Sequence, residues 1–378
     1  MRIIDRYLLR QFLWTFVICY VSLTGLYIVL DAFTNLEEFL RYAHKGGGLL
    51  AMMGSHYSYR GIWFFDKFAG LLTLIAAMFT VTWIQRHNEM TALMSAGVSR
   101  VRVVAPVIGA AVAIAILAAA NRELVIPRFR EQLTRRPKDL VGEVAQKLHS
   151  QNDNRTGILF RGEATFADRK RIEKPDFLLP ASLSDYGRLL VAENAFYKPP
   201  EKDRPGGYLF DKVEKPKHLD TQPSLALDGE PVLITPRDAP DWLRPDQCFV
   251  VSDVRFEQLT NAEAWRQYSS TPDLIAGLHN PSLGYRAEAR VAVHSRLVQP
   301  FLDVTLLFLG LPLVLRRGDR NVFIAIGIAA VVVAVFMLVV MASHYLGSAS
   351  SLSPAFAAWA PLMLFVPVAV GMSEWIRQ

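Results

Sequence analysis

Six long apolar stretches dominate this chain, three within its first 120 residues and three after residue 296, with about 175 mostly polar residues between them. A helix needs about 20 consecutive apolar residues to cross the ~30 Å hydrocarbon core of a bilayer. The pattern therefore predicts an α-helical membrane protein with six transmembrane helices and one large inserted domain. The predicted spans are residues 12–30, 62–84, 101–120, 297–315, 322–345 and 354–372.

Arginines beside the spans predict how the chain is oriented. They gather before span one, between spans two and three, between spans four and five, and after span six, so six crossings place them all on one side. Lys and Arg close to span ends are retained in the cytoplasm. We therefore expect both termini in the cytoplasm and residues 121–296 on the opposite side. The arginines are Arg2, Arg6, Arg10, Arg86, Arg100, Arg102, Arg316, Arg317, Arg320 and Arg377.

Charge and cysteine content argue against several functional classes. The formal net charge is +6, and the arginines at span ends account for this excess, so we expect no nucleic-acid partner. Cys19 lies in span one and Cys248 in the inserted domain, so a disulfide is not expected. No spacing of His, Cys, Asp and Glu matches a metal site, and we predict neither a metal nor another cofactor.

The inserted domain has short strand-like runs, as is typical of a β-sheet protein. It begins with a charged segment, 121–150, that we expect to form a helical or extended stalk. Evenly spaced short strands then predict an antiparallel sandwich or β-jellyroll, and a short helix with Thr271 as N-cap and Pro272 at its first position should close it. The clearest strand candidates are residues 157–160, 188–197, 231–235 and 249–256.

These observations predict three parts of the chain. Residues 1–120 should hold spans one to three, with a short cytoplasmic helix near 88–96 between spans two and three. Residues 121–296 should form the stalk and the jellyroll-like domain, and residues 297–378 should hold spans four to six.

No catalytic motif is visible in the sequence. It lacks the Gly-x-x-x-x-Gly-Lys-Ser/Thr loop that binds nucleotide phosphates, as well as a nucleophile elbow and a zinc-binding helix. His218, His279 and His294 are isolated, and each is expected to be solvated or hydrogen-bonded. A β-sandwich without a catalytic triad is typical of a recognition or structural module. We therefore expect that the chain is not an enzyme.

The connection between spans two and three is the most unusual cytoplasmic segment. Its sequence, QRHNEMTALMSAGVSRV at 85–101, predicts a short helix capped by Asn88 and stopped by Gly97. One predicted face carries Glu89, Leu93 and Ala96, and another carries Met90, Met94 and Gly97. Such a helix can dock into a groove of a soluble partner, or it can lie on the lipid surface, and the residues by themselves leave both interpretations open.

Several segments together resemble the LptF/LptG (YjgP/YjgQ) permeases, and Asp31 at the end of span one fits the same pattern. The similarity covers both membrane halves and the placement of the inserted domain. The segments are EMTALMSAGVSR at 89–100, IDRYLLRQFL at 4–13, NRELVIP at 121–127, HSRLVQP at 294–300, LPLVLRRGDR at 311–320 and PAFAAWAP at 354–361.

The resemblance implies a permease subunit of an ABC transporter in the bacterial inner membrane. Such a subunit extracts lipopolysaccharide or a related glycolipid and passes it to a periplasmic bridge of β-jellyrolls built from LptC/LptA-like proteins. It pairs with a second permease, usually as an LptF–LptG heterodimer, on an LptB-like ATPase dimer, and lipid enters through gates formed by spans one and five. By this resemblance Glu89 would occupy the acidic position that docks to the ATPase, with Met90, Leu93, Met94 and Gly97 beside it.

Charged residues near the membrane supply further candidates. Five basic residues expected near the outer leaflet could bind the phosphates or sugar acids of a lipid headgroup, or could be interfacial anchors. Asp303 falls within span four, where a carboxylate is a functional candidate by default. The structural alternative is that Asp303 faces the helix bundle and pairs with a neighbour such as Lys67 or Arg296. The basic residues are Arg41, Lys45, Arg60, Lys67 and Arg296.

Two other functions remain alternatives to lipid export. One is a mechanotransmitting permease, in which ATP hydrolysis moves the outer domain and no lipid crosses. The other is a membrane-anchored β-sandwich adaptor that uses no energy. The docking-type segment at 85–101 favours a transporter over a passive anchor.

Overall fold

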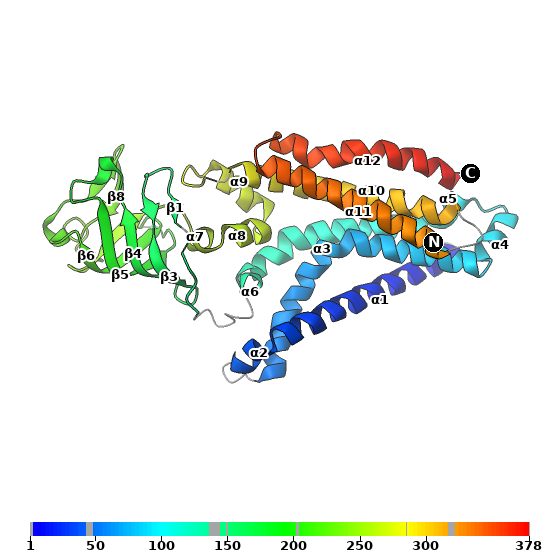
Figure 1. The fold of residues 1–378 in the computed structure, drawn as a ribbon, viewed down its shortest axis with the longest axis horizontal. Coiled ribbons are helices and arrows are strands. Elements are labelled where there is room, and N and C mark those ends of the chain that lie inside the picture. The colour runs from blue at the N-terminus through cyan, green and yellow to red at the C-terminus, as the bar shows by residue number, and fades with distance from the viewer. Residues whose placement is uncertain are drawn as a thin grey trace. The chain divides into compact units, whose positions relative to one another are not determined.

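The computed structural model describes residues 3–42, 48–135, 144–148, 150–201, 204–284, 286–316 and 322–377. They form two compact units, and Figure 1 shows the ribbon of each. The helical unit comprises Met1–Leu133, Ser269–Thr271 and Ala287–Gln378, and the sheet unit comprises Thr134–Tyr268 and Pro272–Arg286.

Within the described residues, six helices of the helical unit are long and apolar enough to cross a membrane. Each contains one of the predicted spans, so this part of the predicted fold is confirmed. Most extend beyond the apolar stretch because polar residues at a span end interrupt the hydropathy without breaking the helix. They are α1 (Ile3–Thr34), α3 (Leu49–Arg86), α5 (Arg100–Ala120), α10 (Arg286–Arg316), α11 (Val322–Ser348) and α12 (Pro354–Arg377).

The two central helices of this unit are α3 and α10. In each, 56% of the apolar window is buried inside the unit, against 11% for α1 and α11. Gly310 of α10 lies against Leu74 of α3 so closely that a Cβ at Gly310 would stand 2.4 Å from the leucine Cδ1. The helices α1 and α11 therefore carry wide apolar faces that the described residues of the unit leave uncovered.

Short elements connect the long helices. At one end, α2 (Leu36–Tyr42) follows α1, and the Tyr57 hydroxyl of α3 donates to Asp31 of α1 at 2.9 Å. The connection between α3 and α5 holds α4 (Glu89–Ser95). Beyond α5 the chain stays helical through a π-helical turn, Asn121–Val125, a 3₁₀ turn, Ile126–Phe129, and α6 (Arg130–Thr134). The predicted stalk is thus helical as far as α6.

The described strands of the sheet unit form one curled antiparallel sheet, a half-barrel, in the order β1-β2-β4-β5-β6-β9-β8-β7 with β3 paired to β4. The predicted β-rich fold is confirmed, as one curled sheet rather than two stacked layers. Register shifts at Val191/Ala192 in β5 and Leu225/Ala226 in β7 are irregularities of the kind that increase local twist. The strands are β1 (Gln151–Asn152), β2 (Leu159–Phe160), β3 (Gly162–Phe166), β4 (Arg171–Leu178), β5 (Leu189–Lys198), β6 (Gly207–Lys215), β7 (Leu225–Leu227), β8 (Glu230–Ile234) and β9 (Cys248–Val251).

Three short helices follow the last strand. They are α7 (Phe256–Thr260), α8 (Ala262–Tyr268) and α9 (Thr271–His279). The predicted helix beginning near Thr271 is confirmed, whereas α7 and α8 were not predicted. The predicted strand 249–256 was too long, because β9 ends at Val251 and Phe256 already begins α7.

Aromatic side chains fill the core of the sheet unit. Phe160, Phe177, Tyr208 and Phe210 are fully buried, and their ring centroids lie 4.6–5.9 Å apart in the pairs that touch. The Tyr208 hydroxyl donates to the Val254 carbonyl at 3.0 Å, which satisfies the one polar atom of this cluster.

Candidate functional site

The helix α4 ends in a hydrogen-bonded glycine cap. The Gly97 amide donates to the Met94 carbonyl and the Val98 amide to the Leu93 carbonyl, both at 3.0 Å, with Gly97 at φ +80°. This is a Schellman motif, and it confirms the predicted stop at Gly97. The predicted side-chain cap at Asn88 is wrong, since Asn88 has φ 58° and its side chain makes no capping bond. Asparagine tolerates this left-handed conformation, which turns the chain sharply out of α3.

The side chains of α4 point both into the helical unit and away from it. Met90 is buried and Leu93 packs against the same core cluster, whereas Met94 is 38% exposed. The predicted faces therefore differ from the observed packing. Met90 and Leu93, predicted on different faces, both pack on the helix bundle, whereas Met94, predicted beside Met90, is exposed. Glu89 is half-buried.

Two polar contacts connect the start of α1 to this region. The Tyr7 hydroxyl donates to Glu89 Oε1 at 3.2 Å, and Arg102 at the start of α5 contacts Asp5 Oδ2 at 3.2 Å. The first turns of α1 are thereby linked to both α4 and α5.

A buried ion pair lies where α5 passes into the π-helical turn. Arg122 Nε is 2.8 Å from Asp66 Oδ1 of α3, and both side chains are less than 15% exposed. The neighbouring Asn121 donates to the Ile62 carbonyl at 3.1 Å. Single π-helical turns re-aim side chains and occur often at functional sites. Here the turn directs Asn121 and Arg122 onto α3.

The next residue contacts the segment by which the chain returns to the helical unit. Glu123 accepts hydrogen bonds from the Thr271 amide at 2.7 Å and the Thr271 hydroxyl at 2.6 Å. Arg296 of α10 lies 3.7 Å from Glu123 Oε1 and donates to the Ser269 carbonyl at 2.5 Å. We name Glu123, Ser269, Thr271 and Arg296 the latch, since they join the outgoing and returning segments of the chain.

Asp303 of α10 has a different partner from either predicted one. Gln299, one turn earlier on the same helix, donates to Asp303 Oδ1 at 2.9 Å, and the described residues show no pair with Lys67 or Arg296. The carboxylate lies directly against Gly70 of α3, where a Cβ would stand 2.3 Å from Oδ1. Residues spaced four apart share a helix face, so the local partner satisfies Asp303 without a cross-helix ion pair.

The five basic candidates occupy dissimilar positions. Arg41 is exposed and lies 3.8 Å from Glu37, Arg60 is half-buried, and Lys67 is exposed on α3. The Arg296 side chain is only 9% exposed and belongs to the latch. Lys45 falls outside the described residues.

The sequence was compared with known families. The family model described as "Lipopolysaccharide export system permease LptF/LptG" matches residues 6–174 and 220–375, which is most of the chain. The chain belongs to the LptF/LptG family. A comparison with curated proteins gives no match.

Membership of the LptF/LptG family establishes the general class. The chain is a permease of the lipopolysaccharide export system, not itself an enzyme, and a multi-pass protein of the inner membrane. The family model leaves out residues 175–219, which contain β5 and β6. Those two strands nevertheless pair with each other and with β4 and β9 in a single sheet.

Several contacts of this LptF/LptG chain escaped the sequence analysis. Asp66 lies inside predicted span two, and a carboxylate there was a signal that the analysis passed over. Arg122 and Glu123 directly follow span three but were assigned only to a stalk. Their partners could not be identified in advance, because nothing local in the sequence connects Glu123 with Thr271.

Proposed function

We propose that this chain is one permease subunit of an ABC transporter that takes lipopolysaccharide or a related glycolipid from the inner membrane and delivers it to a periplasmic β-jellyroll bridge. In this proposal both termini are cytoplasmic and the sheet unit is periplasmic. The observation that carries it is the pair of contacts that connect α1 to α4 and to α5, within a chain of the LptF/LptG family. Through these contacts, a force applied to α4 by a partner would act on α1.

An ATPase partner would act on α4. The chain carries no nucleotide-binding loop, so an LptB-like ATPase dimer would supply the energy. Met94 offers an exposed apolar contact, Glu89 an acidic one, and Met90 and Leu93 anchor α4 to the bundle beneath. Gly97 closes the helix and fixes its length. Force applied at Met94 and Glu89 would thus reach α1 through Tyr7.

The lipid would enter beside α1 and α11. These are spans one and five, and they are the helices least covered within the unit. A second LptF/LptG-type subunit, forming a heterodimer, would cover part of these faces and leave a cavity between the subunits. Moving an acyl chain into water costs about 0.8 kcal/mol per CH₂, so a continuous apolar path lowers the barrier to extraction.

The lipid headgroup would meet basic residues at the periplasmic end of the membrane. Lys67 and Arg41 are exposed and available to phosphates, and Arg60 and Lys45 are further candidates. We assign Arg296 to the latch instead. Through the latch, motion of α5 and α10 would reach both segments that lead to the sheet unit, which would then pass lipid to LptC/LptA-like partners.

Purification from native membranes tests this proposal. The expected preparation contains an ATPase, a second six-span subunit and bound glycolipid, and Glu89→Arg should remove the ATPase while leaving the second subunit. Glu37→Ala, at an exposed acidic position on α2, serves as the control. A chain that carries neither ATPase nor glycolipid, under conditions that preserve membrane complexes, would favour the adaptor alternative. An ATPase without any lipid would favour mechanotransmission.

A further inference from the structure

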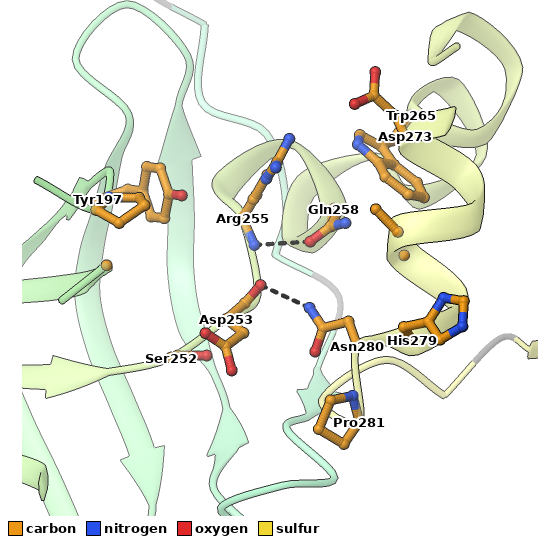
Figure 2. Close-up of a pocket in the computed structure, with 14 residues that line it drawn as sticks. Tyr197, Ser252, Asp253, Arg255, Gln258, Trp265, Asp273, His279, Asn280 and Pro281 are labelled. Carbon is orange, nitrogen blue, oxygen red and sulfur yellow. Dashed lines mark hydrogen bonds between the residues drawn. The ribbon is translucent and has the colours of Figure 1, made fainter. Parts of the chain in front are cut away.

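A cavity of about 420 Å³ lies within the sheet unit, apart from the aromatic core. It is formed by the segment that follows β9, by α7 and α8, and by α9, and Figure 2 shows its lining. All 14 lining residues belong to the sheet unit. The volume falls within the usual range of small-molecule sites.

The lining excludes an acyl chain as the ligand. None of the 14 residues is Leu, Ile, Val, Met or Phe, and eight of them are charged or carry a polar amide, imidazole or hydroxyl group. The apolar part consists of aromatic rings, prolines, glycines and Ala276. Aromatic faces beside hydroxyl-binding side chains suit a sugar ring, which has apolar C–H faces and a polar edge. The ligand that fits this lining is polar and ring-shaped.

The floor of the cavity is Trp265 of α8. Trp265 is only 2% exposed, and its ring lies against Gly277 of α9, where a Cβ would stand 2.7 Å from the ring. Because a larger side chain at Gly277 would push α9 away from the ring, the glycine sets the width of this part of the cavity. A floor packed in this way is preorganised and loses little conformational entropy when a ligand binds.

An arginine without an ion pair stands at the wall of the cavity. Within the described residues Arg255 forms no ion pair, while its backbone amide donates to Gln258 Oε1 at 2.8 Å and its carbonyl accepts from the Gln258 and Leu259 amides. The Tyr197 hydroxyl points to the same side in Figure 2. Burial raises the pKa of Tyr197, with a further rise from Glu257 and an opposing effect from Arg255, so the hydroxyl remains a donor at neutral pH. Arg255 and Tyr197 both line the cavity, so each can donate a hydrogen bond to an anionic group of a ligand.

The opposite wall offers partners for hydroxyl groups. Asn280 uses one amide hydrogen for the Asp253 carbonyl at 2.9 Å and keeps a second. Oδ2 of the Asp253 carboxylate lies 3.2 Å from Arg155 Nε, and the Asp253 side chain is 56% exposed. His279 contacts the Ile275 carbonyl through Nδ1 at 2.9 Å, which makes Nδ1 the protonated nitrogen and leaves Nε2 for a ligand.

We propose that this cavity binds a monosaccharide unit that carries a phosphate or carboxylate, with Arg255 and Tyr197 on the anionic group and Asn280 and His279 on the hydroxyls. Tyr197, Pro200 and Gly206 of its lining lie in the segment that the family model does not cover. The site therefore goes beyond what family membership implies. Its lining suits a sugar and not an acyl chain.

Direct binding of water-soluble sugars to the full-length chain in detergent tests the proposal. The probes are glucose 6-phosphate, glucuronic acid, neutral glucose and inorganic phosphate, followed by saturation-transfer NMR and calorimetry. The two acidic sugars should compete for one site and bind about tenfold more tightly than glucose, as expected for one charge-assisted interaction. Acidic sugars that bind no more tightly than glucose would overturn the proposal. Inorganic phosphate that binds as tightly as glucose 6-phosphate would also overturn it, since the site would then recognise only an anion.

Three variants distinguish sugar binding in this cavity from nonspecific attraction of the acidic sugars to surface arginines. Arg255→Gln should reduce the affinity for both acidic sugars about tenfold, whereas Arg169→Gln, at an arginine that is 78% exposed and not part of the lining, should leave it unchanged. Ala276→Trp fills the cavity from an exposed position of α9 and should abolish binding of all the sugars without lowering the Tm. Equal effects of the two arginine variants, or full binding by Ala276→Trp, would contradict the assignment.

The source of the sugar is decided in a second experiment. If the ligand is the headgroup sugar of a transported glycolipid, Arg255→Gln should slow glycolipid transfer. If it is a free sugar phosphate, transfer should be unchanged although glucose 6-phosphate no longer binds. Failure of lipid transfer in every sample would count against the proposed function and leave the binding result intact.

Discussion

Glu123 accepts two hydrogen bonds from Thr271, a residue 148 positions further along the chain, at 2.6 and 2.7 Å. The pair joins the helix that leaves the membrane core to the segment that returns to it. With Arg296 holding the Ser269 carbonyl, the latch joins the π-helical turn and α10 to the segment Ser269–Thr271 within the helical unit.

Removing the latch carboxylate should weaken both stability and transport. Glu123→Ala removes the acceptor of the Thr271 amide and hydroxyl and the ion pair with Arg296, which should cost about 1–3 kcal/mol and lower the Tm. Thr271→Ala removes only the hydroxyl bond and should cost about 1 kcal/mol. Thermal unfolding in detergent and ATP-dependent lipid transfer measure the two effects. Equal behaviour of Glu123→Ala and the exposed control Glu37→Ala would show that the latch has no role.

The Asp66–Arg122 pair predicts a non-additive mutant cycle. Breaking a buried pair on one side should destabilise the fold by about 3–5 kcal/mol, because it leaves a buried charge alone. Asp66→Leu and Arg122→Leu should therefore each be strongly destabilising, and the double variant should recover most of the loss. The Tm of the three variants tests this expectation. A double variant that is less stable than either single one would contradict it.

The contact between Gly70 and Asp303 predicts a specific rescue. Gly70→Ala would place a Cβ 2.3 Å from the Asp303 carboxylate, so α3 and α10 must separate, at a cost of about 1–3 kcal/mol. Asp303→Ala should restore much of the stability of Gly70→Ala. Gly54→Ala is the matched control, since nothing lies within 4 Å of its added Cβ and alanine favours the helix. A stability loss at position 54 as large as at position 70 would refute this packing argument.

Cys248 should be unreactive in the folded protein. It is fully buried in β9, and burial raises the pKa of its thiol. Its contribution to stability is therefore complete below the unfolded pKa of about 8.5 and declines as the pH rises above it. In a Cys19→Ser background, alkylation should be slow between pH 7 and 9 and become fast on unfolding. Rapid labelling of the native chain would contradict the burial of Cys248.

Elements whose signal is local in the sequence were predictable. Each apolar span lies in a long helix, because the length of an apolar run is a property of neighbouring residues. The strands β5 and β8 matched predicted runs for the same reason. By contrast, β4 and β6 were not predicted. Pro175 is unusual inside a strand and obscures the strand pattern of β4, and Lys212, at φ 53°, interrupts the regular geometry of β6.

The candidate site was harder to predict because its contacts are distant in sequence. The helix α4 and its stop at Gly97 follow from a local pattern, but the burial of Met90 depends on where α4 packs on the bundle. The partner of Asp303 was within reach of the sequence, since Gln299 lies one turn away, yet a cross-helix ion pair was expected instead. The latch joins segments separated by the whole inserted domain, so no sequence period could indicate it.

The most direct test of the account is ATP-dependent glycolipid transfer in proteoliposomes that contain this chain, its partner subunit and the ATPase. Met94→Glu and Glu89→Arg should abolish transfer and reduce ATPase recruitment while the Tm stays unchanged for Met94→Glu, since Met94 is exposed. Met90→Ala should instead lower the free energy of unfolding by about 2 kcal/mol or more, and with it the Tm, because Met90 is buried. Full ATP-dependent transfer by both Met94→Glu and Glu89→Arg would contradict the claim that energy enters through α4.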